Sequence, residues 1–139
     1  MEMCASYLIK SDNCLKASKI LLKAGLYENS IGEAYYAMYN ATLSLLFKCG
    51  IKCENHTGSI LLLNILFKLE MLHNILSNAK TERIDKQYYI MDAHAILDSK
   101  ETSDRMIKEA ESFILELRNY SNRLTNDNIK KVRESFATL

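Results

Sequence analysis

The absence of proline and the presence of only four glycines in 139 residues restrict the fold of this chain most strongly. All-β proteins use both residues in their many tight turns, and α/β proteins use glycine in the loops that join strands to helices. A chain with so few of either residue has few, short connections. The composition therefore predicts a helical protein.

Apolar residues recur at helical spacing along most of the sequence. This periodicity predicts helices over about 4–24, 30–50, 57–76 and 83–97, one from about 103, and a short one over 128–136. The polar run 77–80 separates the third from the fourth. Gly25 lies where a left-handed residue would end the first helix. Ser30 and Glu33 match the capping box, which predicts a helix start at Ser30.

These segments predict an all-α protein, an antiparallel up-and-down bundle of four to five helices. The length fits one domain. We assign residues 1–125 to the bundle and residues 126–139 to a C-terminal extension, either a short helix or a tail.

Charge and cysteine content limit the function classes. Eighteen basic residues against seventeen acidic ones give a net charge of +1, so bulk charge does not indicate nucleic-acid binding. Residues 1–25 are charged throughout and lack the apolar core of a secretory signal, which predicts a cytoplasmic protein with reduced thiols. The most apolar run, 60–67, is too short to cross a membrane.

The predicted second helix carries two apolar stripes, so it is expected to be the central helix of the bundle or part of a subunit interface. Tyr35, Tyr36 and Tyr39 lie on these stripes. Tyrosines at this spacing either fill a core or provide stacking surfaces for bases, and the sequence leaves both interpretations open. Glu33 and Asn40 share the remaining narrow face, where they either line a cleft or face solvent.

Two further patterns are weak. Cys49, Cys53 and His56 have a spacing that zinc sites use, but a structural zinc site needs a fourth ligand. The alternative is a helix end followed by a loop, and we expect no metal and no cofactor. Lys68 and His73 lie five residues apart, a spacing that fits either a phosphate site or the solvated edge of a helix.

The segment 27–63 resembles the HEPN domain family, in its stand-alone prokaryotic branch. The resemblance extends over about residues 5–120, and its most specific part is the Ala-Tyr-Tyr-Ala core of residues 34–37. Arg83 with Tyr88 or Tyr89 resembles a later Arg…Tyr segment of the family. The other positions shared with the family pattern are Gly25, Tyr27, Met38, Ala41, Gly50, His56, Gly58, Ala110 and Phe113.

The resemblance implies a helical bundle that is commonly a homodimer. It also implies a toxin–antitoxin module, in which many members pair with a minimal nucleotidyltransferase. By the same resemblance, active members of the family are expected to be metal-independent ribonucleases. They use an arginine and a histidine four to six residues apart near the dimer cleft, where the arginine holds the scissile phosphate and the histidine moves a proton.

This sequence departs from the ribonuclease pattern. No arginine has a histidine four to six residues after it. Glu33 stands where the family often has arginine, and Asn40 stands where some relatives have histidine. A carboxylate repels phosphate, and an asparagine cannot act as an acid or base near pH 7.

We therefore expect a HEPN-like protein with a degenerate ribonuclease motif that binds a nucleotide, RNA or a nucleotidyltransferase partner. Two alternatives stay open. One is an active ribonuclease toxin that uses His56 or His73 with Arg83 or Lys68, and the other is a bundle that serves only in assembly. The residues expected to line the cleft are Glu33, Tyr36, Asn40, His56, Arg83 and Tyr89.

Overall fold

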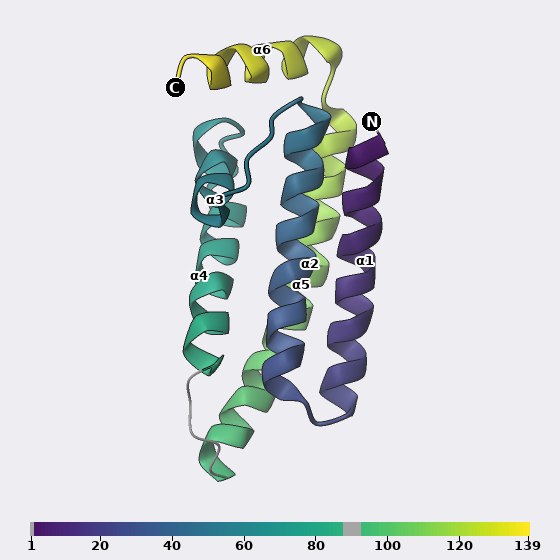
Figure 1. Ribbon diagram of the computed structural model, residues 1–139, viewed down its shortest axis with the longest axis vertical. Helices are drawn as coiled ribbons and strands as arrows, with labels where there is room; N and C mark the ends of the chain where they lie inside the picture. The colour runs from purple at the N-terminus through teal and green to yellow at the C-terminus, as the bar shows by residue number, and fades with distance from the viewer. Residues whose placement is uncertain (1, 88–92) are drawn as a thin grey trace.

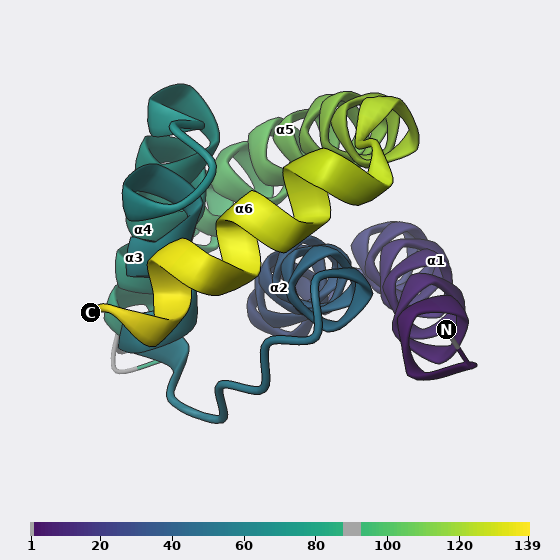
Figure 2. The same cartoon turned by 90° about the horizontal axis from the view of Figure 1, so that it is seen from above.

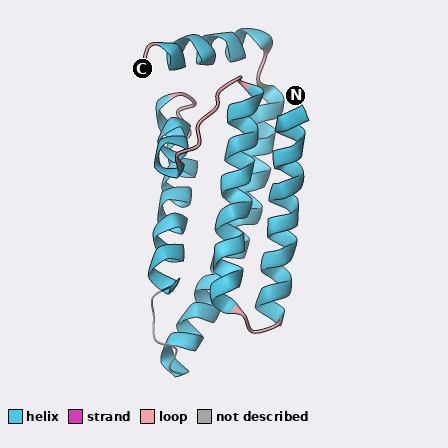
Figure 3. Cartoon of the chain, viewed as in Figure 1, coloured by secondary structure: helices cyan, strands magenta, loops and turns pink. Residues whose placement is uncertain are grey.

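A computed structural model describes residues 2–87 and 93–139 of the chain. These residues form six helices and no strand (Figures 1 and 3). The all-α prediction is confirmed, with more helices than the four to five expected. The helices are α1 (Glu2–Lys23), α2 (Tyr27–Lys48), α3 (His56–Ile65), α4 (Glu70–Gln87), α5 (Ala93–Arg123) and α6 (Asn126–Ala137).

The long helices alternate in direction. In Figure 1, α1 and α4 run downward while α2 and α5 run upward, and α6 lies across the upper end. Seen from above in Figure 2, α2 lies between α1 on one side and α3 and α4 on the other, with α5 behind. No helix of the described residues is long and apolar enough to cross a lipid bilayer.

α2 is the central helix, as one of the two sequence interpretations expected. Tyr35, Met38, Leu45 and Leu46 on this helix are fully buried. Their positions cover more than one face, because α2 contacts α1, α3, α4 and α5. Burial on most sides explains why the helix carries two apolar stripes.

Small polar residues form the contact between α1 and α2. The Ser11 hydroxyl donates to the Ala37 carbonyl at 2.6 Å, and the Ser44 hydroxyl donates to the Cys4 carbonyl at 3.0 Å. Each buried hydroxyl therefore has a partner, and the small side chains allow the two backbones to approach closely. The narrow polar face of α2 packs on α1 and does not face open solvent.

The predicted capping box at Ser30 is wrong. α2 begins at Tyr27, and Ser30 is fully buried inside it. The Ser30 hydroxyl donates to the Ser18 carbonyl at 2.7 Å and accepts from the Ser103 hydroxyl at 2.6 Å. Ser30 therefore joins α1, α2 and α5. Ser103 was expected near the start of a helix, but α5 begins at Ala93 and holds Ser103 in its interior.

The boundaries predicted for the third and fourth helices are also wrong. The chain leaves the helical path between Ile65 and Glu70, where Lys68 has a φ of 58°. The Leu69 amide donates to the Leu63 carbonyl at 2.9 Å, a hydrogen bond across six residues that closes the end of α3. Because no glycine marks this left-handed residue, composition alone gives no sign of it.

The polar run 77–80, predicted as a break, lies inside α4. Leu72, Leu76 and Ala79 are buried at helical spacing along this stretch, so one apolar face continues through it. α6 closes the upper end of the bundle. Its start is capped by Thr125, its Val132 side chain is buried, and Arg133 Nε donates to the Cys49 carbonyl at 3.2 Å.

Gly25 ends α1 with a φ of +78°, as the sequence predicted. Gly25→Ala should lower the free energy of unfolding by about 1 kcal/mol, because a Cβ is disfavoured in the left-handed region. Gly32→Ala is the control: Gly32 lies inside α2 without a positive φ, so alanine there should raise stability by about 0.5–1 kcal/mol. Urea unfolding measures both, and equal effects of the two substitutions would contradict the assignment.

Candidate functional site

Three tyrosines of α2 face the beginning of α3. Tyr35 and Tyr39 lie one helical turn apart and stack with a ring-centroid distance of 6.0 Å. The His56 ring stacks on Tyr39 at 3.9 Å and 13°, and the Tyr35 hydroxyl lies 2.8 Å from His56 Nδ1. These contacts fix both the position and the orientation of the imidazole.

Arg83 reaches this group of rings from α4. Its guanidinium carbon lies 5.1 Å from the Tyr35 ring centroid and 5.3 Å from that of Tyr36. Nη1 donates to the Tyr36 hydroxyl at 3.3 Å. Nε is buried, and no atom of the described residues accepts a hydrogen bond from it. The Arg83 guanidinium is therefore held against the faces of two tyrosine rings, and part of its hydrogen-bond donor capacity is unused within the described residues.

A third basic side chain lies beside the first turn of α3. Lys80, one turn before Arg83 on α4, donates to the Thr57 hydroxyl at 2.7 Å. Asn55 caps the helix by accepting from the Gly58 amide at 3.1 Å. In the part of the chain that the structure describes, none of the three basic groups forms an ion pair with a carboxylate. His56, Lys80 and Arg83 are called the basic cluster below.

The surroundings of the basic cluster keep its histidine neutral. Burial lowers the pKa of His56 below its ordinary value of 6.5, and the charges of Arg83 and Lys80 lower it further. Burial also raises the pKa of Tyr35, so its hydroxyl keeps its proton next to the imidazole. At neutral pH the cluster therefore combines two cations with one neutral, proton-accepting ring.

Two surface hollows adjoin the cluster. One, of about 390 Å³, includes His56 with Tyr39, Lys52 and Cys53 among its lining residues. The other, of about 290 Å³, is lined by the N-terminal half of α2 together with Arg83. The rings of Tyr35 and Tyr36 contact both the imidazole and the guanidinium.

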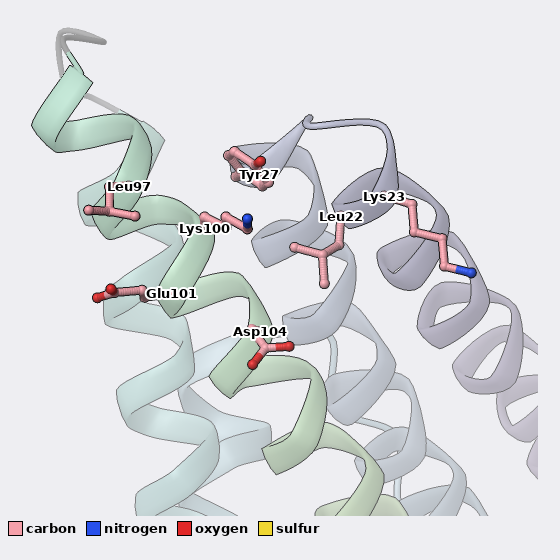
Figure 4. Close-up of a pocket in the computed structure, with 7 residues that line it drawn as sticks. All are labelled: Leu22, Lys23, Tyr27, Leu97, Lys100, Glu101 and Asp104. Atoms are coloured by element: carbon pink, nitrogen blue, oxygen red, sulfur yellow. The ribbon is translucent and has the colours of Figure 1, made fainter.

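A larger hollow of about 560 Å³ lies between the α1–α2 turn and the beginning of α5. Figure 4 shows Lys100 next to Tyr27 across from Leu22, while Lys23 points away from this group. One of its two acidic residues, Asp104, forms an ion pair with Lys108 at 3.1 Å. None of the described residues predicted for the cleft lines this hollow, although it includes Tyr27 of the family pattern.

A family model described as HEPN domain matches residues 5–120. The chain belongs to the HEPN domain family. A relative from Methanocaldococcus jannaschii, named Putative toxin MJ0605, is 27% identical over 101 residues, which cover 72% of this chain and 75% of the relative. The resemblance found in the Ala-Tyr-Tyr-Ala segment is thereby confirmed.

In this HEPN protein the structure brings together three of the predicted cleft residues, namely Tyr36, His56 and Arg83. His56 and Arg83 lie 27 positions apart in sequence, so folding and not local spacing makes them neighbours of Tyr35. Tyr89 lies outside the described residues. Lys80 was not predicted, and Tyr35 was predicted only as a core residue or a stacking surface. Treating 77–80 as helix would have placed Lys80 on the same face as Arg83, because the two lie three residues apart.

Glu33 and Asn40 do not join the basic cluster of the HEPN bundle. The Asn40 amide donates to the Cys14 thiol at 3.7 Å, so Asn40 faces α1. Burial, together with the charge of Glu33, raises the pKa of Cys14 to about 11. Glu33 also lines the smaller hollow beside Arg83. The two residues share one face, as expected, but only Glu33 borders the candidate site.

The residues of the two weak patterns are dispersed. His73 contacts the side chain of Asn74, and exposed Lys68 occupies the turn before α4. Cys49 is buried under α6, whereas His56 stacks on Tyr39. Within residues 2–87 and 93–139, no group of three metal-ligating side chains comes together.

The lowered pKa of His56 predicts a pH dependence of stability. Between its folded and unfolded pKa values the unfolded HEPN chain binds more protons, so the free energy of unfolding decreases as pH falls through about 6.5. His56→Gln should remove this component, which urea unfolding at a series of pH values measures for both proteins. The prediction is wrong if the two proteins lose stability in parallel below neutral pH.

Proposed function

We propose that this HEPN protein binds RNA, with a phosphate of the RNA backbone seated at His56, Lys80 and Arg83. The observation that carries the proposal is that these three groups lie together around the Tyr35 ring and the beginning of α3. Among the described residues, no carboxylate forms an ion pair with them. The first turn of a helix adds partial positive charge at the same place. The Arg83 guanidinium suits a phosphate oxygen, because charge-assisted hydrogen bonds to phosphate are among the strongest.

Membership of the family and the name of the relative support a biological setting for this binding. We propose that the protein belongs to a toxin–antitoxin-type module, in which it forms a homodimer and binds a nucleotidyltransferase partner. Light scattering of the purified protein tests the dimer. A monomer at all concentrations would contradict that part of the proposal and leave RNA binding untouched.

The experiment for RNA binding is a titration of a labelled single-stranded oligouridine with the full chain at several salt concentrations. Lys80→Gln should weaken binding and reduce the slope of log affinity against log salt by about 0.7, the contribution of one phosphate contact. Lys130→Gln is the matched control, because Lys130 is exposed on α6 away from the cluster. Equal effects of the two substitutions would contradict the proposed site.

A second candidate function is RNA cleavage, and the contact of His56 and Arg83 with the same tyrosine favours it. A neutral imidazole can accept the proton of a ribose 2′-hydroxyl while the guanidinium holds the scissile phosphate. Gel analysis of RNA after incubation with the protein distinguishes the two functions. Products that form with the wild type and not with His56→Gln would indicate a nuclease, and intact RNA would indicate binding alone.

A further inference from the structure

The hollow beside Arg83 carries, besides this arginine, polar groups that the phosphate site does not use. It has a volume of about 290 Å³ and lies along the N-terminal half of α2, with Arg83 of α4 on one side. Its lining residues are Glu28, Asn29, Gly32, Glu33, Tyr36 and Arg83.

Gly32 keeps the floor of this hollow open. It lies inside α2 without a positive φ, so the backbone does not require glycine there. A Cβ on Gly32 would meet no atom of the described residues within 4 Å, so their packing does not require glycine either. Glycine is a poor helix former in such a position. Its effect is therefore to leave space that any other side chain would fill.

Within the described residues, the carboxylates that line the hollow form no ion pair with its arginine. In the described part of the chain, neither Glu28 nor Glu33 lies within 4 Å of a basic nitrogen, although both border the same hollow as Arg83. The hollow thus combines hydrogen-bond acceptors, the Arg83 donor and the Tyr36 ring in one lining.

This arrangement fits one base better than the others. Guanine carries two adjacent donors, N1–H and the 2-amino group, which a carboxylate can accept together, and it carries the acceptors O6 and N7, to which an arginine can donate. Adenine and cytosine present an unprotonated ring nitrogen beside their amino group, and a carboxylate repels that nitrogen. Uracil has a single N–H between two carbonyls.

We propose that the hollow at Gly32 binds a guanine base of the RNA. This inference rests on the proposed function, since Arg83 borders both the base hollow and the phosphate site. Glu28 or Glu33 accepts from the guanine edge, Arg83 donates to O6 or N7, and Tyr36 contacts the face of the ring. The protein would then prefer guanine at the position next to the bound phosphate.

The test compares short oligouridines that carry one central guanosine, inosine or adenosine, titrated against the full chain. Guanosine should bind at least 10-fold more tightly than adenosine, because unpaired polar groups in the site penalise the wrong base. Inosine, which lacks the 2-amino group, should lie between them. Gly32→Leu should remove the preference while its melting temperature stays at or above that of the wild type. Asn13→Leu, on the exposed face of α1, is the control and should keep the preference.

The outcomes separate the inference from the proposed function. If Lys80→Gln weakens binding of all three RNAs but the wild type binds them equally, the guanine site is overturned and the phosphate site stands. If the preference survives in Gly32→Leu, the guanine binds elsewhere and the inference is overturned as well. If none of the three RNAs binds, both the phosphate site and the guanine site are contradicted.

Discussion

Leu117→Ala should lower the free energy of unfolding by about 2–5 kcal/mol, the cost of truncating a buried leucine and leaving a cavity. Leu117 is 1% exposed in the C-terminal third of α5, the helix that packs on α2. Its neighbours Phe113 and Ile114 are also buried, so the surrounding core has little freedom to collapse into the space. Urea unfolding followed by circular dichroism measures the loss.

Leu115 provides the matched control, because it lies two residues away on the same helix and is 62% exposed. Leu115→Ala removes the same atoms and should change stability by no more than about 0.5 kcal/mol. Similar losses for the two substitutions would mean that the face of α5 toward α2 is assigned incorrectly.

Arg83→Gln should weaken RNA binding by about 10- to 100-fold, which corresponds to the ~1.5–3 kcal/mol of a charge-assisted hydrogen bond. The substitution removes the fork of donors that the Tyr35 and Tyr36 rings hold in place. Arg83→Lys keeps the charge but loses the planar fork, so its affinity should lie between those of the wild type and Arg83→Gln.

Arg123→Gln is the control for net charge, since Arg123 is an exposed arginine at the end of α5. It should change affinity by less than threefold at moderate salt, because exposed charges at a distance are screened. Thermal unfolding of each variant shows that the fold is retained. Equal losses with Arg83→Gln and Arg123→Gln would indicate a diffuse electrostatic surface in place of a defined phosphate site.

The elements with strong periodicity were predicted best. The first helix ends at Gly25 as expected, and the two apolar stripes of α2 identify it as the central helix. The errors occur where a local signal was ambiguous. Ser30 has the spacing of a helix cap, yet its hydroxyl holds three helices together from a buried position. A serine serves either role, and only the packing of α1 and α5 decides between them.

The break between α3 and α4 could not be predicted, because Lys68 takes a left-handed conformation in which glycine is usual. Because the sequence contains no sign of this break, the end of the third helix was predicted too late in the chain. Residues 77–80 were then predicted as a loop, although they lie inside α4. For the same reason, Lys80 was not predicted as a site residue. It shares a helix face with Arg83 only when residues 77–80 are helical.

The candidate site was predicted in part. His56 and Arg83 were named, but their proximity depends on three tertiary contacts of Tyr35 and Tyr39 that no sequence spacing encodes. Asn40 was named for its place on the polar face of α2. That face proved to be the contact with α1, since small hydroxyl side chains there satisfy buried carbonyls.

The most direct test of the basic cluster is an NMR titration with single-stranded oligouridine that follows the arginine Nε–H and histidine ring signals of the full chain. The Arg83 Nε–H and the His56 ring signals should shift together as RNA is added, because the bound phosphate lies beside both side chains. The signals of His73 and Arg118, which lie outside the cluster, should stay unchanged. RNA binding that moves other signals and leaves Arg83 and His56 unaffected would contradict the account.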